Sequence, residues 1–294
     1  MKTELYHALS KLHLGNAVYP VVRMACRPCP LPPAEEAGAF LHTLSKREKS
    51  GCIADKLYEN RKEYDLDLIV PVYNVKDYLA QCLDSVLNQK TKYRIRVICV
   101  EDGSTDGTAA ICRERGYHLI SLPVNLGLAG AFQTGMKYAY AHGYDYAIQF
   151  DADGQHSAAY IDDMVEVAEE TGANVVVGSR FADCKKPFSA RMAGSALITA
   201  MIFVTTRKRI EDPTSGMRLF DSKMIPLFAN ELDFGPEPDT ISLLMRHGYK
   251  VEEMQVEMRE RTAGESYLNF TKSVSYMLRI SLSILIVQWF RRRK

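Results

Sequence analysis

The sequence predicts an α/β protein built on a doubly wound, mostly parallel sheet that is flanked by helices. From residue 66 onward, short apolar runs alternate with stretches whose apolar residues recur at helical spacing. Repeated units of this length are typical of strand–helix–strand crossovers, which join parallel strands. Carboxylate-rich segments follow several of the apolar runs. Ligands bind at the carboxyl ends of the strands in such sheets, so these segments are candidates for a site.

Composition limits the classes of protein that the chain can belong to. It has 294 residues, of which 47% are hydrophobic, so it can bury a core as one large domain or two small ones. Its 37 basic and 36 acidic residues give a net charge of +1, and we therefore expect no nucleic acid as a partner. Seven scattered cysteines are typical of reduced thiols in a cytosolic compartment. The N-terminus has no apolar signal segment, so we expect the chain to stay on the cytoplasmic side.

Three regions are expected along the chain. Residues 1–63 read as an N-terminal appendage, which the run RPCPLPP at 27–33 divides because proline cannot continue a helix. Residues 64–270 form the α/β domain, and residues 271–294 form a C-terminal amphipathic helix.

Strand and helix signals alternate in order within the α/β domain. The apolar runs predict strands at 67–74, 93–100, 118–123, 144–150 and 174–181. Helical periodicity predicts helices at 75–89, 109–115, 127–143, 158–171 and 240–248.

The segment FDADGQH (150–156) follows one of the predicted buried strands. Asp151 and Asp153 can both turn toward one divalent cation, and Gln155 supplies a further oxygen at the same period. Hard oxygen ligands of this kind suit Mg²⁺ or Mn²⁺ that also holds a diphosphate. The alternative is an acidic turn with Gly154 at its corner.

A second polar segment, EDGSTDGT (101–108), follows the strand expected at 93–100. The carboxylate of Asp102 can accept hydrogen bonds from a ribose or a base, while Ser104 and Asp106 shape the turn and cap the next helix. Together with PVYN (71–74) and FDADGQH, this segment places three polar strand ends along one edge of the sheet. A Rossmann dehydrogenase would need a G-x-G-x-x-G loop after the first strand, and VPVYNV contains no glycine.

Seven motifs occur in the order found in family-2 glycosyltransferases of the GT-A fold, and the chain resembles the branch that contains dolichyl- and polyprenyl-phosphate sugar synthases. The motifs span about residues 66–270: IVPVYN, EDGSTDGT, NLGLAGAFQTGMKYA, FDADGQH, VVGSRF, DPTSGMRLFD and MRERTAGES. The resemblance implies an inverting, metal-dependent transfer from a nucleotide-diphosphate sugar, with a metal held by Asp151, Asp153 and Gln155. It further implies a nucleotide site made by Pro71, Tyr73, Asn74, Asp102, Asp151 and Ala152.

The resemblance also implies an acceptor site in the second half of the domain. Arg191 and Ser195 are four residues apart, so they share a helix face where both can hold a phosphate. A solvated arginine and a packed serine are the alternative. Similar synthases carry an arginine and a serine at this spacing after an SR-aromatic motif, matched here by Arg180 in Ser-Arg-Phe. Their C-terminal R-x-x-G-x-S segment is matched by Arg261 and Ser266.

The sequence departs from the family pattern at two positions. Tyr267 stands where a lysine is usual, which leaves one phosphate contact open. Val75 stands where synthases that use GDP-mannose tend to carry an acid, which leaves the nucleotide and the sugar of the donor open.

Glu237 and Asp239, in FGPEPDTIS, lie where many family members carry an acid pair. Either can act as a general base toward a sugar hydroxyl, whereas a lipid phosphate is already anionic and needs no base. The alternative is that Asp239 caps the helix expected at 240–248.

The segment SVSYMLRISLSILIVQWF (273–290) is apolar except for its serines, Arg279 and Gln288, and RRRK follows it. It is short for a membrane span, so it predicts a helix that lies on the membrane surface. A helix packed on the protein itself or on a partner subunit is the alternative.

The sequence thus predicts an enzyme that uses Mg²⁺ or Mn²⁺ to move a sugar from a nucleotide donor to polyprenyl phosphate at the cytoplasmic face of a membrane. Transfer to a saccharide hydroxyl in surface-polysaccharide synthesis is the first alternative. A sugar nucleotidyltransferase would need a glycine-rich basic loop after the first strand, and PVYNVKDYL is not such a loop. A non-catalytic protein that only binds a nucleotide sugar is a further alternative. A membrane partner subunit and a homo-oligomer are also open.

Overall fold

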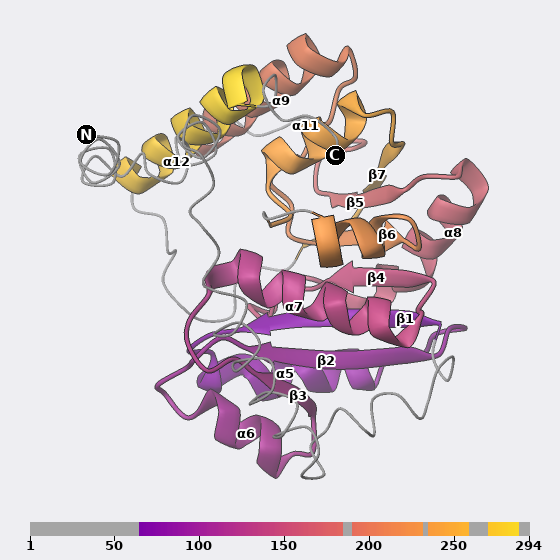
Figure 1. Ribbon diagram of the computed structural model, residues 1–294, viewed down its shortest axis with the longest axis vertical. Helices are drawn as coiled ribbons and strands as arrows, with labels where there is room; N and C mark the ends of the chain where they lie inside the picture. Colours follow the sequence, from indigo (N-terminus) through magenta and orange to yellow (C-terminus); the bar gives the residue numbers. More distant parts are fainter. Residues whose placement is uncertain (1–64, 185–189, 232–234, 259–269, 288–294) are drawn as a thin grey trace, which may run out of the picture.

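The structure is a computed structural model that describes residues 65–184, 190–231, 235–258 and 270–287. Its centre is a seven-stranded sheet with the strand order β3-β2-β1-β4-β6-β5-β7 (Figure 1). The N-terminal appendage expected at 1–63 lies outside the described residues. The strands are β1 (Leu66–Val72), β2 (Ile95–Glu101), β3 (His118–Ser121), β4 (Tyr146–Gln149), β5 (Val175–Ser179), β6 (Arg218–Asp221) and β7 (Val251–Gln255).

The expectation of a mostly parallel sheet is confirmed. The pairs β1–β2, β1–β4, β2–β3 and β5–β7 are parallel. Only β6 runs antiparallel to its neighbours β4 and β5 among the described strands. The apolar pattern did not predict β6, because four residues in the order RLFD are too short to show a period.

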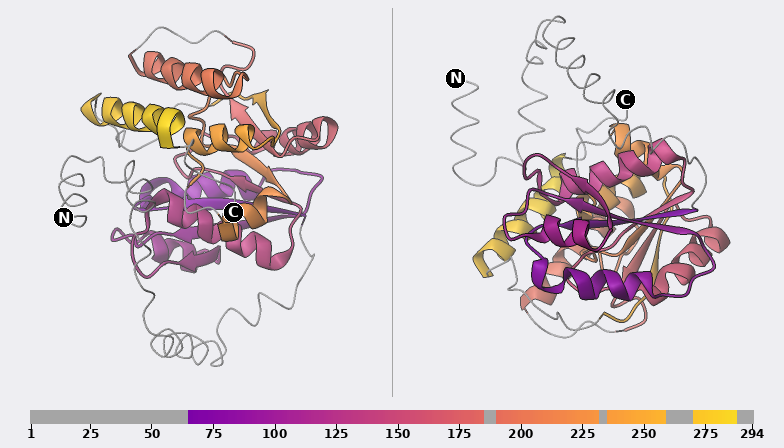
Figure 2. Two further views of the ribbon diagram at one scale, coloured as in Figure 1. Left: turned by 45° about the horizontal axis from the view of Figure 1, so that its top comes forward. Right: turned by 90° about the horizontal axis from the view of Figure 1, so that it is seen from below.

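Helices cover both faces of the sheet, as the turned views in Figure 2 show. The helical and 3₁₀ or π-helical segments are α5 (Lys76–Leu87), α6 (Thr108–Glu114), α7 (Gly127–His142), η1 (Ala158–Tyr160), α8 (Ile161–Thr171), α9 (Ala190–Thr206), α10 (Met224–Pro226), η2 (Leu227–Glu231), α11 (Pro238–Arg246), α12 (Phe270–Leu282) and η3 (Ser283–Val287). Helix α11 begins two residues earlier than expected, with Glu237 as its N-cap and proline at its first position.

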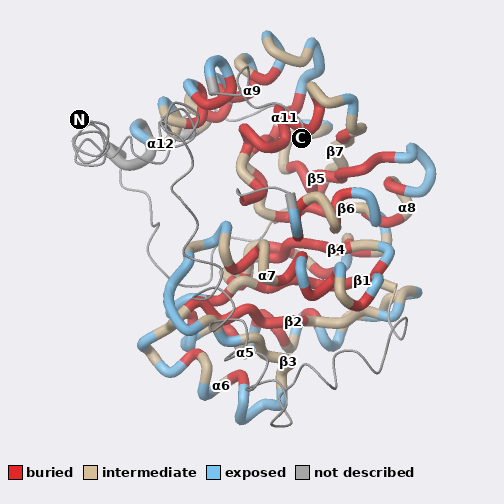
Figure 3. Tube along the Cα trace, viewed as in Figure 1, coloured by how far each residue is buried: buried red, intermediate tan, exposed pale blue. Residues whose placement is uncertain are grey.

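Each face of the sheet contributes to its own apolar core, because side chains alternate along a strand. On one face Ile69 and Ile98 pack with Phe132 and Met136 of α7. On the other, Leu68, Val70 and their neighbours pack against α5 and α8. In Figure 3 the central strands β1, β4, β5 and β6 are mostly buried and the outer strands β3 and β7 are mostly intermediate, while exposed positions lie on the outer sides of the helices and in the loops.

Helices α9 and α12 lie side by side at one end of the molecule (Figure 1). They approach closely at Gly194, where a Cβ atom would lie 1.6 Å from the sulfur of Met277. Ile280 and Ile284 of the C-terminal segment are buried in the main core. The C-terminal helix therefore packs on the protein, and no helix in the described ranges is both long and apolar enough to cross a membrane.

Candidate active site

The polar segments predicted from the sequence converge on one edge of the sheet, namely the edge where the parallel strands end. The carboxyl ends of β1, β2, β4 and β5 lie at this edge because these strands run in the same direction. The amino end of β6 joins them because β6 runs the opposite way. Such an edge is the usual ligand site of a doubly wound sheet.

The ends of β1 and β2 are tied together by the two loops that follow them. The backbone N–H of Asn74 donates to Ser104 Oγ over 3.1 Å, and Asn74 Oδ1 accepts from the backbone of Thr105 over 2.9 Å. Asn74 holds a left-handed conformation with φ of 53°, which asparagine tolerates better than most residues. The neighbouring Tyr73 ring is 46% exposed and available to stack on a base.

The predicted capping role of Asp106 is confirmed. Its Oδ1 atom accepts from both the backbone N–H and the hydroxyl of Thr108 at the start of α6, over 2.9 and 2.6 Å. Its Oδ2 accepts from the backbone of Lys76 at 3.1 Å, so one carboxylate serves the first turns of two helices.

The remaining residues predicted to bind the nucleotide lie deeper. Asp102 is buried, and its Oδ1 atom accepts from the backbone N–H of Leu126 over 2.6 Å. One oxygen of this carboxylate thus holds the loop that leads into α7. Pro71 is half-buried at the end of β1, and Ala152 is buried in the loop after β4.

Asp151 is held from three sides where the chain leaves β4. Gln149 Nε2 donates to its Oδ1 over 3.1 Å, and its own backbone N–H donates to His156 Nδ1 over 3.1 Å. Its Oδ2 lies over Gly216, where an added Cβ would stand only 2.0 Å away. Only glycine at 216 allows this carboxylate position, so the loop before β6 is shaped around Asp151.

The donor set fits Mg²⁺ or Mn²⁺ bound together with a diphosphate. Asp151 and Asp153 are both half-buried, and Asp153 Oδ1 accepts from the backbone N–H of Gln155 over 3.1 Å. No three His, Cys, Asp or Glu side chains of the described residues gather into a complete metal cage. Two carboxylates are the usual protein share at an Mg²⁺ site whose other ligands are phosphate oxygens and water.

Arg180, predicted to bind the acceptor, forms a paired contact with Asp212. Its Nε and Nη2 atoms donate to the two carboxylate oxygens over 2.6 and 2.8 Å. Burial alone would raise the pKa of Asp212, but the hydrogen bonds from Arg180 outweigh burial and lower it. Much of the donor fork of Arg180 is thereby committed to holding the loop at 212 against β5.

The other predicted acceptor residues are placed only in part. Arg191 and Ser195 lie one turn apart on α9, as expected, and Ser195 is buried. The side chain of Arg191 is outside the description, and so are Arg261 and Ser266. The residues predicted to hold the metal and the nucleotide therefore follow strands that end at the same edge of the sheet, and the residues predicted to bind the acceptor are described only in part.

The acid pair is held by the C-terminal helix. Tyr276 on α12 donates its hydroxyl hydrogen to Glu237 Oε2 over 2.5 Å, and the Ser283 hydroxyl contacts Asp239 Oδ2 over 2.5 Å. Asp239 is buried within the first turn of α11, and Glu237 is half-buried. The N-cap of α11 is Glu237 rather than Asp239, and Glu237 makes no capping hydrogen bond through its side chain.

Arg218 is a buried cation whose charge interacts with Glu237 and Asp151, and the sequence predicted no role for it. It opens β6 with only 2% of its surface exposed, and Nη2 donates to the backbone oxygen of Pro213 over 2.7 Å. Burial lowers the pKa of this guanidinium, and the charges of Glu237 and Asp151 act in the opposite direction. Arg218 lies within the motif DPTSGMRLFD, but only the fold shows that its side chain is buried and interacts with the charges of Glu237 and Asp151.

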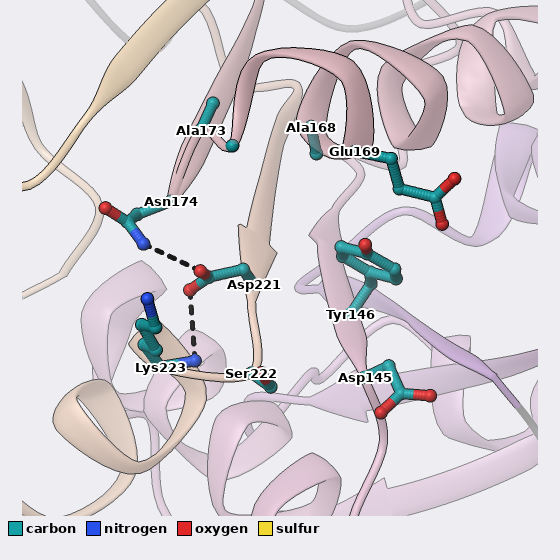
Figure 4. A pocket seen from close by; sticks show the side chains of 10 residues that line it. Asp145, Tyr146, Ala168, Glu169, Ala173, Asn174, Asp221, Ser222 and Lys223 are labelled. Carbon is teal, nitrogen blue, oxygen red and sulfur yellow. Dashed lines mark hydrogen bonds between the residues drawn. The ribbon is translucent and has the colours of Figure 1, made fainter.

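A pocket of about 350 Å³ lies at the opposite edge of the sheet (Figure 4). It is lined by Asp145, Tyr146 and Glu169, and by Asp221, whose carboxylate accepts from Asn174 and from the backbone of residue 223. It contains none of the residues predicted for the active site.

Known proteins resemble this chain in sequence. The sequence profile of the family described as glycosyl transferase family 2 matches residues 67–229. An undecaprenyl-phosphate mannosyltransferase of Micrococcus luteus is 27% identical over 217 residues, which cover 68% of this chain and 86% of the relative. A UDP-N-acetylglucosamine–dolichyl-phosphate N-acetylglucosaminyltransferase of Methanococcus voltae is 27% identical over 186 residues, covering 56% and 72%.

Solved structures share the fold at low identity. A mannosyltransferase of Pyrobaculum calidifontis in complex with GDP-mannose and Mn²⁺ has a TM-score of 0.55 and 15% identity, covering all of this chain and 75% of that one. A mannosyl-3-phosphoglycerate synthase of Rubrobacter xylanophilus has a TM-score of 0.58 and 17% identity, covering 81% and 79%.

Proposed function

The chain belongs to glycosyl transferase family 2, and on that premise we propose that it moves a sugar from a nucleotide-diphosphate donor to a polyprenyl phosphate at a membrane surface. The observation that carries the proposal is the carboxylate pair of Asp151 and Asp153 at the strand edge, with Asp151 fitted against Gly216. This pair occupies the same edge as the segments that follow β1 and β2.

The donor end of the reaction follows from this arrangement. Asp151 and Asp153, with Gln155 beside them, would hold Mg²⁺ or Mn²⁺, which neutralises charge on the diphosphate as the glycosidic bond breaks. Asp153 contributes to catalysis in this way. Tyr73, Asn74 and the loop that Asp102 holds would border the nucleoside.

A phosphate acceptor is supported by two observations. Relatives over most of the domain are named as transferases to undecaprenyl and dolichyl phosphate. Helices α9 and α12 and the π-helical segment η3 also leave large apolar side chains exposed, which is unusual unless a partner covers them. These residues are Leu197, Phe203, Val204, Leu278, Leu282, Leu285 and Ile286.

Basic residues follow the exposed apolar side chains of α9 in the sequence. Arg207, Lys208 and Arg209 directly follow α9 and are exposed. Apolar side chains flanked by basic ones suit the surface of an anionic bilayer, where a lipid phosphate is met. The exposed residues of α9 and α12 thus support a peripheral position on the membrane.

Transfer to a saccharide hydroxyl is the second candidate, and Glu237 is the observation that favours it. This half-buried carboxylate interacts with the charge of the buried Arg218, as Asp151 also does. A sugar hydroxyl must lose a proton during transfer, and a carboxylate in this place can accept it.

One experiment tests the proposal. The purified full chain is incubated with Mn²⁺, a panel of nucleotide sugars and undecaprenyl phosphate in detergent, and the lipid products are identified by mass spectrometry. We expect a glycosyl undecaprenyl phosphate from one donor. Products on an oligosaccharide acceptor, with none on the lipid phosphate, would overturn the proposal in favour of the second candidate.

A further inference from the structure

The C-terminal segment contacts the acid pair with two hydroxyl groups that lie seven residues apart. Tyr276 donates to Glu237 Oε2, and Ser283 contacts Asp239 Oδ2, each over 2.5 Å. The continuous segment formed by α12 and η3 thereby contacts both carboxylates of residues 237–239. Hydrogen bonds to a charged acceptor are short and stronger than those between neutral groups.

These contacts lie on the inner side of α12. Ile280 and Ile284 from the same segment are buried, whereas Leu278, Leu282 and Leu285 are exposed. The segment thus has one side fixed to the protein by apolar packing and hydroxyl groups, and a second side that is apolar and open.

Burial keeps the phenol of Tyr276 in its donor form. Burial raises the pKa of Tyr276 far above its usual range, and the negative charge of Glu237 raises it further. The hydroxyl therefore stays protonated at every working pH. The guanidinium of Arg279 lies over the Tyr276 ring, 5.7 Å from its centroid, and further restricts it.

The contact extends to the edge where the metal residues lie. Glu237 and Tyr276 both act on the buried charge of Arg218, and Asp151 acts on it as well. A shift of Glu237 would change the electrostatic surroundings of Arg218 because a buried charge is poorly screened. The position of Glu237 thus bears on the whole site.

We infer that Tyr276 of α12 and Ser283 of η3 are positioning residues, through which the C-terminal segment holds Glu237 and Asp239 in the arrangement that the transfer step requires. The C-terminal helix is then a wall of the acceptor side of the site as well as a surface element. This inference rests on the proposed function, since it concerns the same transfer.

Isosteric variants test the inference. Tyr276→Phe and Ser283→Ala each remove one hydroxyl and keep most of the packing. Ser281→Ala is the matched control, because Ser281 is buried on the same helix and its hydroxyl has no hydrogen-bond partner within the described ranges. For Tyr276→Phe we expect kcat to fall about tenfold, with donor Kd from calorimetry within twofold of the unchanged protein. Ser281→Ala should leave both values within twofold.

A double-mutant cycle separates positioning from a general loss of stability. If Tyr276 acts through Glu237, Tyr276→Phe should cost less than twofold in kcat once Glu237→Ala is present. Equal cost in both backgrounds, or wild-type kcat in Tyr276→Phe, overturns the inference. Should Tyr276→Phe fail to fold, Ser283→Ala in the Asp239→Ala background gives the same comparison. Failure of the proposed function is distinct, because the unchanged protein would then form no glycosyl lipid phosphate.

Discussion

At the scale of single residues, the clearest expectation concerns Asp153. Replacing it by alanine should abolish turnover and weaken nucleotide binding in Mn²⁺, because one of two carboxylate ligands is lost. The fold should survive, since the side chain is half-buried in a loop and fills no core position. Calorimetric titration of the nucleotide with Mn²⁺ and with chelator measures the effect.

Asp163→Ala provides the control for Asp153→Ala, because Asp163 is an exposed carboxylate on α8 and should leave metal-dependent binding unchanged. Full activity of Asp153→Ala in the presence of chelator would contradict a metal role for this residue.

His118, on the edge strand β3, gives the protein a pH-dependent stability. Burial lowers the pKa of His118 to about 4, and Arg96 lowers it further. Below pH 6.5 the His118 imidazole is protonated in the unfolded chain but stays neutral in the folded chain. The stabilisation is therefore complete above pH 6.5 and is lost as the pH falls toward 4.

Urea unfolding at pH 7 and pH 5 checks this expectation against His118→Gln, which cannot titrate. The free energy of unfolding should fall more steeply in the unchanged protein than in the variant. Equal slopes for the two proteins would show that His118 is not the group responsible.

At the scale of elements, the loop into α11 separates the two acceptor classes. If the acceptor is a lipid phosphate, Glu237→Gln and Asp239→Asn should each reduce kcat by well under the 10²–10⁴-fold expected on removal of a general base. Each amide retains an oxygen that can accept from Tyr276 or Ser283, so the local packing should be kept. Steady-state rates on the lipid acceptor measure the change, and a near-dead amide variant would favour a hydroxyl acceptor.

The elements of the first half of the domain could be predicted from the sequence because each carries its own period. The strands at 66–72 and 95–101 and the helix at 127–142 differ from their predicted bounds by one or two residues. Strand β6 escaped prediction because it is short, and its position between β4 and β5 depends on pairings with distant segments.

The candidate site was predictable where a motif follows a strand and obscure where it depends on tertiary packing. Asp151 and Asp153 could be proposed as metal ligands because they follow a predicted buried strand and accompany the other family motifs. Arg218 and Tyr276 could not be predicted, because nothing local indicates that one guanidinium is buried beside carboxylates or that a phenol on the last helix reaches Glu237. The C-terminal helix was expected at a membrane surface, and its packing against α9 was only the alternative.

At the scale of the whole molecule, the exposed apolar residues of α9 and α12 define a surface that single substitutions can test. Deleting residues 273–294 would remove Ile280 and Ile284 from the core and so confuse stability with membrane contact. Leu278→Glu avoids this problem, because Leu278 is 55% exposed.

We expect Leu278→Glu to reduce binding to vesicles of anionic phospholipid at least threefold in a sedimentation assay, since a charge is repelled from the acyl boundary. Leu87→Glu is the control: Leu87 is equally exposed, at 55%, but ends α5 on the other side of the sheet. Equal vesicle binding by the two variants would show that the exposed apolar residues of α9 and α12 do not mediate membrane contact.

The measurement that tests the central claim most directly is a comparison of two lipids that differ by one phosphate. The full chain, Mn²⁺ and the productive nucleotide sugar are given undecaprenyl phosphate or undecaprenol in the same detergent, and sugar transfer to each lipid is followed with a radiolabelled donor. We expect transfer to the phosphate alone, because an anionic acceptor needs no base. Chelator should abolish this transfer. Comparable transfer to the free alcohol would show that the acceptor is not a polyprenyl phosphate.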